Sequence, residues 1–509
     1  MIKKSILGRR VYILMNKHEI PEGKKRLPAE GLEVDVEIID LNQHGQGVGR
    51  IDGFIVFADD ALPGELVRLV IDTVKKNYAV GYVTKYLRTS ADRITAPCSL
   101  AASCGGCSVQ TLKYDKQLEW KRNYIINLLR RARMDNIADQ IVKPVIGMEH
   151  PWFYRAKVQI PFAGVAKNVK AGFYARRSHD VVDGDICLIQ HPVADLIRST
   201  VRNFLLKHEI EPYNELSHSG VFRHLVIRMG FYTGQVMVIL VTSDTSMPHV
   251  EDLQIDLKTA IAAWSSPEAD SYNNEADDFN NKDKIAQKYE LVSLWQNVNH
   301  KKTNLILGDH FQLLAGKSYV EEKICGLTYR ISPRAFFQVN PLQTNVLYKE
   351  VVRLAGLTKQ DYVLDLYCGT GSISLLLAEF ASDVKGVEIV EAAIEDAKVN
   401  AKINSITNVE FVCAAAEKWL PEYLAEGGKA DVAIIDPPRK GCDPELISAI
   451  CDSGISRIVY VSCNPATLVR DLELLSETYT LVTIQPVDMF PHSDSIECIA
   501  SLIRKNVHI

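Results

Sequence analysis

The sequence has 509 residues, of which 47% are hydrophobic and 24% charged, and its net charge is −5 at pH 7. This composition excludes a disordered or collagen-like chain, and the length predicts about three domains with a large buried core. No run approaches the roughly 18 apolar residues of a membrane span, and the apolar stretch 11–15 is too short for a signal peptide. We therefore expect a cytoplasmic protein without membrane contact, whose clustered cysteines serve metal binding or catalysis rather than disulfides.

Residues 1–31 are basic and weakly patterned, and we predict a loosely ordered extension there. Apolar and acidic residues then alternate over 32–37, which is the period of a half-buried strand. Further short β-rich runs and a glycine-rich segment at 44–50 predict a small closed barrel over residues 32–93. Barrels of this size commonly bind oligonucleotides.

Residues 94–330 have a mixed pattern, with a helix predicted from Thr111 to about Arg133. The polar, acidic stretch at about 265–284 predicts a surface insertion. Residues 98–180 hold 14 lysines and arginines against 6 acidic residues, interleaved with aromatic residues. A nucleic-acid surface has this mixture, and a solvated helix face with ordinary core aromatics explains it equally well. The set includes Trp120, Lys121 and Tyr154.

The C-terminal region, residues 331–509, alternates strand-like runs with helix-length segments from residue 361 onward. This alternation predicts a doubly wound, mostly parallel sheet, the layout of a class I, Rossmann-like methyltransferase domain. No helix separates the two final strand runs, 481–486 and 496–503, so the last strand is expected to enter antiparallel. The other predicted strands are 362–366, 384–387, 409–412, 432–435 and 457–461, and the predicted helices are 372–380, 391–404, 417–424, 444–451 and 465–475.

A glycine loop, residues 365–371, lies between the first predicted strand and helix of this region. Glycines let the backbone approach a ligand outside the carboxyl end of a strand. Glu388 ends the next strand, where an acid can accept hydrogen bonds from ribose hydroxyls. The loop is not the G-x-G-x-x-G of dinucleotide enzymes, and the pattern therefore favours S-adenosylmethionine over NAD.

Asp436 ends the fourth predicted strand and is followed by Pro437, Pro438, Arg439 and Lys440. A carboxylate there lies beside the reacting end of the cofactor, and the prolines stiffen the loop. In amino-group methylases an aromatic residue usually follows the prolines and stacks on the base. The arginine and lysine found here argue against an exocyclic nitrogen as the methyl acceptor.

Cys463, in the segment Ser462-Cys463-Asn464-Pro465, decides the predicted reaction class. Carbon 5 of uracil attacks a methyl donor only after a thiolate has added to carbon 6. A base must then remove the carbon 5 proton, and Glu497 at the start of the last strand is the candidate. Cys368 and Cys498 are rival thiols that lack this sequence context.

Three cysteines cluster at Cys98, Cys104 and Cys107, and Cys187 is a possible fourth ligand. Four thiolates suit a [4Fe–4S] cluster or zinc. Zinc sites usually contain two C-x2-C pairs, so the three-plus-one spacing favours iron–sulfur and leaves zinc as the weaker alternative.

Together these motifs resemble those of the RNA uracil-5 methyltransferase family, and within it the branch that methylates 23S ribosomal RNA. The resemblance covers nearly the whole chain: the barrel is similar to a TRAM domain, an RNA-binding fold. Gln110 and the run 172–187 match the family's iron–sulfur signature, and the segment 332–340 matches the stretch before its catalytic domain. The expected architecture is multi-domain α/β, with an OB-like barrel, a central α+β domain carrying the cluster and a Rossmann-like domain.

The resemblance implies that Cys463 is the nucleophile, that Glu497 is the base and that no obligate protein partner is needed. It implies 23S rRNA as the substrate, because the tRNA-specific relative lacks both barrel and cysteines. Ser495 stands where the family has a histidine, which puts a proton relay there in doubt, and the acidic insertion is not a family feature. The S-adenosylmethionine contacts that it implies are Gln338, Tyr367, Glu388 and Asp436.

Two further hypotheses stay open at this point. The first is a uracil-5 methylase that acts on tRNA or on two rRNA uridines. The second belongs to another class: an RNA-binding iron–sulfur assembly or redox protein without methyl transfer.

Overall fold

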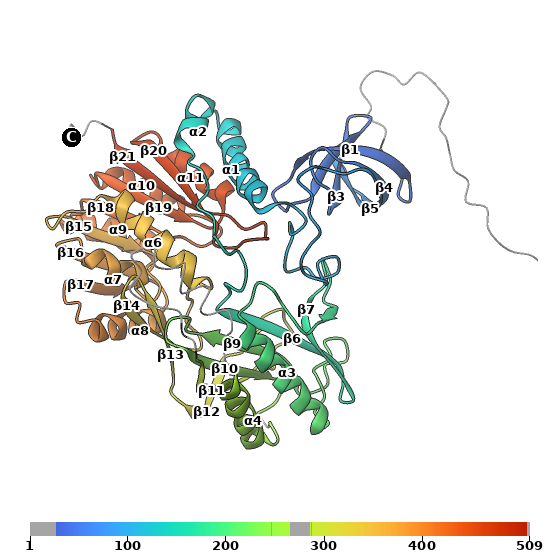
Figure 1. Cartoon of the computed structure of the whole chain (residues 1–509). Helices are drawn as coiled ribbons and strands as arrows, with labels where there is room; N and C mark the ends of the chain where they lie inside the picture. Colours follow the sequence, from blue (N-terminus) through green and yellow to red (C-terminus); the bar gives the residue numbers. More distant parts are fainter. Residues whose placement is uncertain (1–26, 246, 265–285, 287, 506–509) are drawn as a thin grey trace, which may run out of the picture. The chain divides into compact units, whose positions relative to one another are not determined.

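The computed structural model describes residues 27–245, 247–264, 286 and 288–505. It divides into two compact units, one ending at residue 91 and the other formed by residues 92 onward together with 43–45. Each unit is described by itself (Figure 1). Most of the expected N-terminal extension and the whole expected insertion at 265–284 lie outside the described residues.

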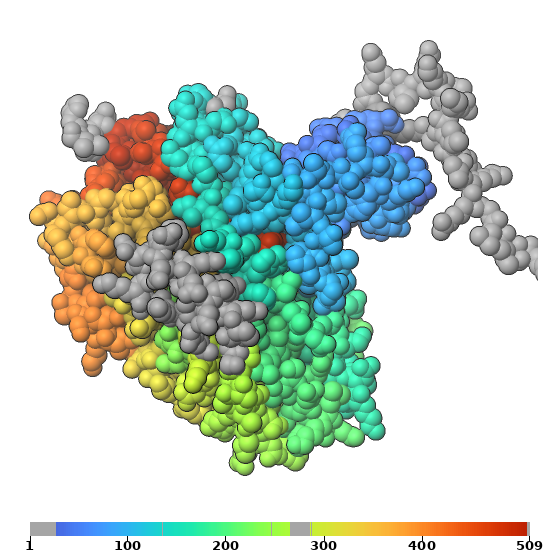
Figure 2. All heavy atoms as spheres, in the orientation of Figure 1, coloured from blue at the N-terminus to red at the C-terminus, as the bar shows by residue number. Residues whose placement is uncertain are grey.

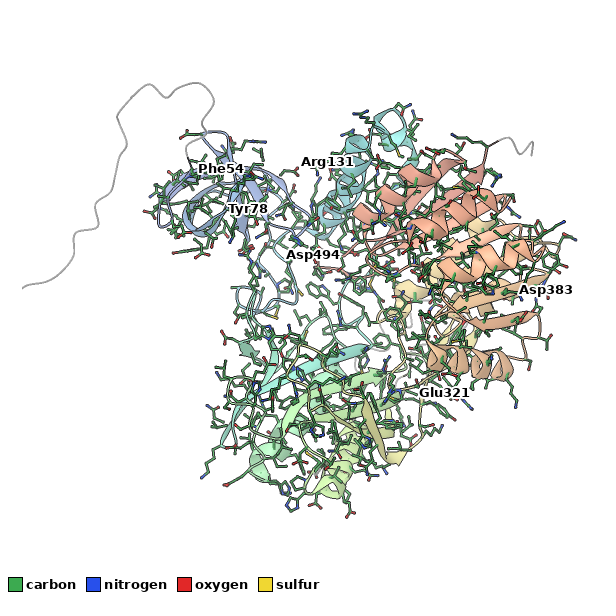
Figure 3. All side chains as sticks on the ribbon, turned by 180° about the vertical axis from the view of Figure 1, so that it is seen from behind. Phe54, Tyr78, Arg131, Glu321, Asp383 and Asp494 are labelled. Carbon is green, nitrogen blue, oxygen red and sulfur yellow. The ribbon has the colours of Figure 1, made fainter. Side chains whose placement is uncertain are left out.

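The first unit contains a closed barrel with the strand order β1-β2-β3-β5-β4, in which β4 pairs back onto β1. Alternate residues point inward and form the core, as the period-2 pattern predicts. Phe54 is 3% exposed in that core, whereas Tyr78 is 37% exposed (Figure 3). The predicted barrel is therefore confirmed. Its strands are β1 (Glu33–Leu41), β2 (Gly47–Ile51), β3 (Phe54–Asp59), β4 (Leu66–Val74) and β5 (Tyr78–Arg88).

A seven-stranded sheet with the order β12-β11-β10-β9-β6-β7-β8 forms the central part of the second unit. Two helices, α3 (Pro192–Lys207) and α4 (Val250–Ala263), lie on the same face of this sheet (Figure 1). Both faces are covered, and β9 and β10 are accordingly buried along nearly their whole length. The strands are β6 (Lys157–Val165), β7 (Asn168–Tyr174), β8 (Val181–Asp183), β9 (Phe222–Met229), β10 (Gln235–Thr242), β11 (Glu290–Val298) and β12 (His310–Gly316).

The central sheet and the C-terminal region share one apolar core. Met237, Ile239 and Val241 of β10 belong to the same buried cluster as Leu375 and Val459 of the C-terminal region. The two parts are thus packed together, and segments from both can contribute to one site. A short hairpin, β13 (Val320–Ile324) and β14 (Leu327–Ile331), lies between them in the sequence.

The C-terminal region is a second seven-stranded sheet with the order β17-β16-β15-β18-β19-β21-β20. The first five strands are parallel, and β21 (Glu497–Arg504) runs antiparallel between β19 (Arg457–Ser462) and β20 (Tyr479–Val487), as predicted. The remaining strands are β15 (Tyr362–Leu366), β16 (Asp383–Glu388), β17 (Val409–Cys413) and β18 (Val432–Ile435). The helices are α6 (Pro341–Ala355), α7 (Ser372–Ala378), α8 (Glu391–Ile403), α9 (Ala416–Ala425), α10 (Pro444–Asp452) and α11 (Pro465–Leu475).

Helix α1 (Tyr114–Arg131) starts and ends inside the predicted range, and the short α2 (Asp135–Ile141) follows it. The helix begins after the predicted Thr111 because Leu112 pairs with Arg93 in an isolated β-bridge. It ends before Arg133, whose φ of 60° lies in the left-handed region. Across the described residues, none of the helices is both long and apolar enough to cross a membrane.

Candidate active site and cysteine-lined cavity

Cys463, Glu497 and Asp436 lie at the same edge of the C-terminal sheet. Asp436 follows the end of β18 and Cys463 follows the end of β19. Glu497 is the first residue of β21, which is antiparallel, so its start lies at the edge where the parallel strands end. Ser462 pairs with Cys498 in the β19–β21 ladder, which brings Cys463 beside Glu497.

The local sequence holds Cys463 at a tight joint between β19 and α11. Asn464 caps the helix, since its side chain accepts from the Ala466 amide at 3.1 Å, and Pro465 occupies the first helical turn. The Asn464 amide also donates to the Arg439 carbonyl at 3.0 Å, which ties the Asp436 loop to the cysteine loop. The thiol therefore lies just before a helix N-terminus, where backbone amides favour a thiolate.

Two acidic residues and one basic residue act on the thiol of Cys463. Its pKa is raised to about 11, mainly by burial and also by the charges of Glu497 and Asp436, while the charge of Arg439 acts in the opposite direction. Arg439 is exposed and is the basic residue that acts on both Cys463 and Glu497. A cation beside this thiol would favour the thiolate.

The two acids share this environment. Glu497 is 3% exposed, and burial, together with the charge of Asp436, raises its pKa well above the ordinary glutamate value. Burial raises the pKa of Asp436 to about 7, with a further contribution from Asp365. Neither Glu497 nor Asp436 forms an ion pair with another described residue. The centre is therefore suited to a ligand that carries positive charge.

The glycine loop lies at the next strand ends of the same sheet. The Glu388 carboxylate accepts from the amides of Gly369 at 3.2 Å and Val390 at 2.9 Å, which fixes its position after β16. Gly371 has a φ of 76°, and a Cβ there would lie 2.7 Å from the Phe411 ring, so the turn requires glycine. A Cβ on Gly369 would meet no atom within 4 Å, which leaves open space beside Glu388.

Gln338 and Tyr367, the other two predicted cofactor contacts, have different surroundings. Gln338 is half-buried, and the backbone near it is tied to the C-terminal loop, because Asn340 donates to the Met489 carbonyl at 3.0 Å. Tyr367 adopts a left-handed φ of 69°, which is strained for an aromatic residue. Its ring packs against the cluster that contains Cys442.

A buried ion pair that the sequence reasoning missed holds the loop before Glu497. Lys121 of α1 donates to Asp488 at 2.6 Å, and both side chains are fully buried. Tyr114 donates to the other carboxylate oxygen at 2.9 Å, and Lys121 also reaches the Phe490 carbonyl at 3.1 Å. Helix α1 thereby anchors the chain that leads to the candidate base.

His492, in the same loop, contacts both α1 and the segment that follows the clustered cysteines. It stacks on Trp152 with ring centroids 3.7 Å apart, and Gln117 contacts its Nδ1 at 3.2 Å. Its carbonyl accepts from the amides of Ser108 and Val109, at 3.0 and 3.2 Å. Asp494, labelled in Figure 3, belongs to the same loop. In Figure 2, red atoms from the C-terminal part of the chain emerge as a small patch among the teal atoms of the α1 region.

The four predicted metal-ligand cysteines line one cavity of about 360 Å³. Cys98, Cys104 and Cys107 come from the loop before α1, and Cys187 comes from the loop before α3. Within the described ranges, no three histidine, cysteine or acidic side chains are arranged to hold one metal ion. The cavity that the thiols line is far larger than the roughly 10–15 Å³ needed to hold one water molecule.

Polar contacts fix the walls of this cavity. Gln110 accepts from the Cys98 amide at 3.4 Å, and Arg176 donates to the carbonyls of Ala101 at 3.3 Å and Cys107 at 3.1 Å. Burial raises the pKa of Cys107 to about 12 and that of Cys187 to about 11. All 11 cysteines of the chain are free, so these thiols are available as ligands.

The structure separates the basic, aromatic segment into core and surface residues. Trp120, Lys121 and Tyr154 are buried, and they pack or pair inside the molecule. Arg130 and Lys170 are exposed. Only part of the segment can therefore form a nucleic-acid surface.

Comparison with known proteins adds independent findings. The profile of the family "tRNA (Uracil-5-)-methyltransferase" matches residues 270–505, and that of the TRAM domain matches residues 29–84. An uncharacterized RNA methyltransferase of Clostridium acetobutylicum is 41% identical over 93% of this chain and 97% of its own length. One from Halalkalibacterium halodurans is 41% identical over 97% of this chain and 100% of its own.

A solved structure also resembles most of the chain. It is the Pyrococcus abyssi tRNA (uracil-54, C5)-methyltransferase in complex with S-adenosyl-L-homocysteine, with 27% identity and a TM-score of 0.69. The similarity covers 92% of this chain and 99% of that one. The chain therefore belongs to the tRNA (uracil-5-)-methyltransferase family, and it is an S-adenosylmethionine-dependent RNA uracil-C5 methyltransferase with a TRAM domain.

Proposed function

We propose that this enzyme methylates carbon 5 of a uridine in 23S rRNA through a covalent adduct between Cys463 and the base. The observation that carries the mechanism is the convergence of Cys463, Glu497 and Asp436 at three neighbouring strand ends. The target base leaves its stack to reach this centre, as in other enzymes that modify a base.

The reaction proceeds in two covalent steps. The Cys463 thiolate adds to carbon 6, and the electrons of the 5,6 double bond move into an enolate. Carbon 5 then takes the methyl group, and Glu497 removes the proton from carbon 5 while the thiolate leaves and the double bond re-forms. Burial of Glu497 favours this step, since a carboxylate with a raised pKa is a stronger base than free glutamate.

The acidic centre fits S-adenosylmethionine, whose sulfonium supplies the methyl group. Asp436 and Glu497 lack ion pairs, so a cationic donor balances charge that the described chain leaves uncompensated. Glu388 lies beside the open space at Gly369 and would accept from ribose hydroxyls. Gln338 and Tyr367 complete the proposed contact set.

We propose that Cys98, Cys104, Cys107 and Cys187 hold a [4Fe–4S] cluster. The thiols surround a cavity, whereas zinc needs four sulfurs about 2.3 Å from one point. The Gln190 side-chain oxygen, in the cavity wall, is buried without a hydrogen-bond partner, which fits a group that occupies the space. Anaerobically purified protein should be brown and contain iron and sulfide; colourless protein with zinc would contradict the assignment.

A tRNA substrate is the second candidate, and one specific observation favours it. The Pyrococcus tRNA enzyme matches 92% of this chain, and the unmatched part is smaller than the barrel. The presence of a barrel therefore does not by itself exclude tRNA. The cysteine signature, which resembles that of the 23S rRNA branch, is our reason for ranking rRNA first.

The deciding experiment uses Glu497→Gln with unmodified 23S rRNA and tRNA transcripts. Without the base, elimination stalls, and the covalent enzyme–RNA complex should accumulate on a denaturing gel with the true substrate only. Cys463→Ala, combined with Glu497→Gln, is the matched control and should give no complex. A complex with tRNA alone would overturn the rRNA proposal, and two separate rRNA sites would indicate the dual-site alternative.

We place the reaction in the cytoplasm. Eleven free cysteines, four of them around one cavity, fit a reducing compartment.

A further inference from the structure

Basic side chains line the cysteine cavity together with the thiols. Its wall contains Lys157, the first residue of β6, and Arg155, two residues before it. Arg176 donates to the Cys107 carbonyl, and its charge lowers the pKa of Cys104. No acidic residue is among the described residues that line this space. Arg155 and Lys157 are thus the basic side chains among these lining residues.

These cations lack anionic partners. Neither Arg155 nor Lys157 forms an ion pair in the part of the chain that is described, and the Arg155 Nε donates only to the Lys157 carbonyl, at 3.1 Å. Lys157 is paired in the β6–β9 ladder with Arg228, which is 4% exposed and donates to the carbonyls of Pro333 and Ala335. The charge of Asp396 raises the pKa of Arg228, but the two side chains do not form an ion pair.

Arg155 and Lys157 are both half-buried, and withdrawing a cation from water is unfavourable unless an anion compensates it. Burial, together with the charges of Arg228 and Arg155, lowers the pKa of Lys157 to about 7. A metal centre held by four thiolates is a net anion, and it would supply the missing charge. The cavity and its wall are thus complementary to one class of occupant.

We propose that Arg155 and Lys157 are the counter-cations of the anionic metal–thiolate group, and that they stabilise its reduced state. This proposal rests on the cluster assignment under the proposed function. Reduction adds an electron to an already negative group, and a fixed positive charge nearby favours that state. The two residues therefore raise the reduction potential and help to retain the metal.

The test compares Lys157→Met with Lys170→Met, an exposed lysine on the neighbouring strand β7, in the full chain purified without oxygen. Iron content and a dithionite titration followed by visible absorption are measured. At the wild-type midpoint, Lys157→Met should lower the ratio of reduced to oxidised cluster about tenfold, which is 59 mV for one electron. A potential equal to that of Lys170→Met, with iron retained, overturns the proposal.

Lys157→Arg guards against a simple folding defect. If Lys157→Met loses iron and Lys157→Arg keeps it, the positive charge is required and the proposal is supported. If both variants lose iron while Lys170→Met keeps it, the position acts through packing and the proposal is overturned.

The metal content of the wild-type protein tests the cluster assignment separately from the counter-cation role. Wild-type protein without any metal overturns both proposals. Wild-type protein with zinc overturns only the iron assignment, and the counter-cation role is then judged by zinc loss to a chelator. Faster loss from Lys157→Met than from Lys157→Arg and Lys170→Met supports that role, and equal rates overturn it. Methyl transfer is not used as a readout.

Discussion

Cys463 and the four cavity cysteines lie in surroundings of opposite charge. Cys463 faces two carboxyl groups, Glu497 and Asp436, with one exposed arginine nearby. The four cavity thiols face Arg155 and Lys157, with no acid in the wall formed by described residues. The two sites therefore differ in the type of charged residue beside the sulfur.

The difference indicates what each site receives. An acidic centre lowers the free energy of a cationic methyl donor, whereas a basic cavity lowers that of an anionic metal–thiolate group. Thiols are common to both, so the residue type alone does not distinguish a nucleophile from a ligand. In this chain the two kinds of thiol differ in the charged residues around the sulfur.

The strongest test of the comparison removes the sulfur at the acidic centre. Cys463→Ala should reduce methyl transfer by about 10⁴-fold or more, because the nucleophile and its base act as a unit. Binding of S-adenosylmethionine should persist, as measured by calorimetry. Cys413→Ser, which changes an exposed thiol at the end of β17, is the control and should keep wild-type activity. Activity of Cys463→Ala near that of the control would refute the nucleophile.

The next largest effect is expected from breaking the buried ion pair between Lys121 and Asp488. Lys121→Met leaves Asp488 buried without its partner and should destabilise the chain by about 3–5 kcal/mol, measured by urea unfolding. Lys116→Met breaks an exposed pair on the same helix and should leave the unfolding midpoint nearly unchanged. Equal midpoints for the two variants would show that α1 does not anchor the loop before Glu497.

Arg439 gives the smallest effect and sharpens the electrostatic side of the comparison. Its charge lowers the pKa of Cys463, so Arg439→Met should raise that pKa above about 11 and slow alkylation at pH 8. The pH profile of iodoacetamide labelling, followed by mass spectrometry, should move upward by less than about one unit, since the guanidinium is exposed. Lys440→Met is the control at the neighbouring position. A shift to lower pH would contradict the assigned sign.

The sequence predicted those parts of the fold and candidate site that follow from regular strands. Asp436, Cys463 and Glu388 each follow or end a strand whose apolar run is visible in the sequence, and parallel strand ends meet at one edge. The barrel and the antiparallel last strand were predictable for the same reason, and both are confirmed.

What the sequence did not predict depends on distant contacts without a local period. Lys121 and Asp488 are 367 residues apart, and a lysine on a helix is normally exposed. Arg155 and Lys157 were counted with a basic segment that suggests a nucleic-acid surface, yet they line an internal cavity. Charge counts along a chain do not tell which charges become buried.

The position of β21 has a consequence for synthesis of the protein. This strand is the last of its sheet to leave the ribosome, yet it inserts between β19 and β20, which were made before it. Until it arrives, both neighbours present unpaired backbone edges, and the residue assigned as proton acceptor is missing. A nascent chain that stops short of this strand is therefore exposed to aggregation and lacks that acceptor, whatever RNA it has already engaged.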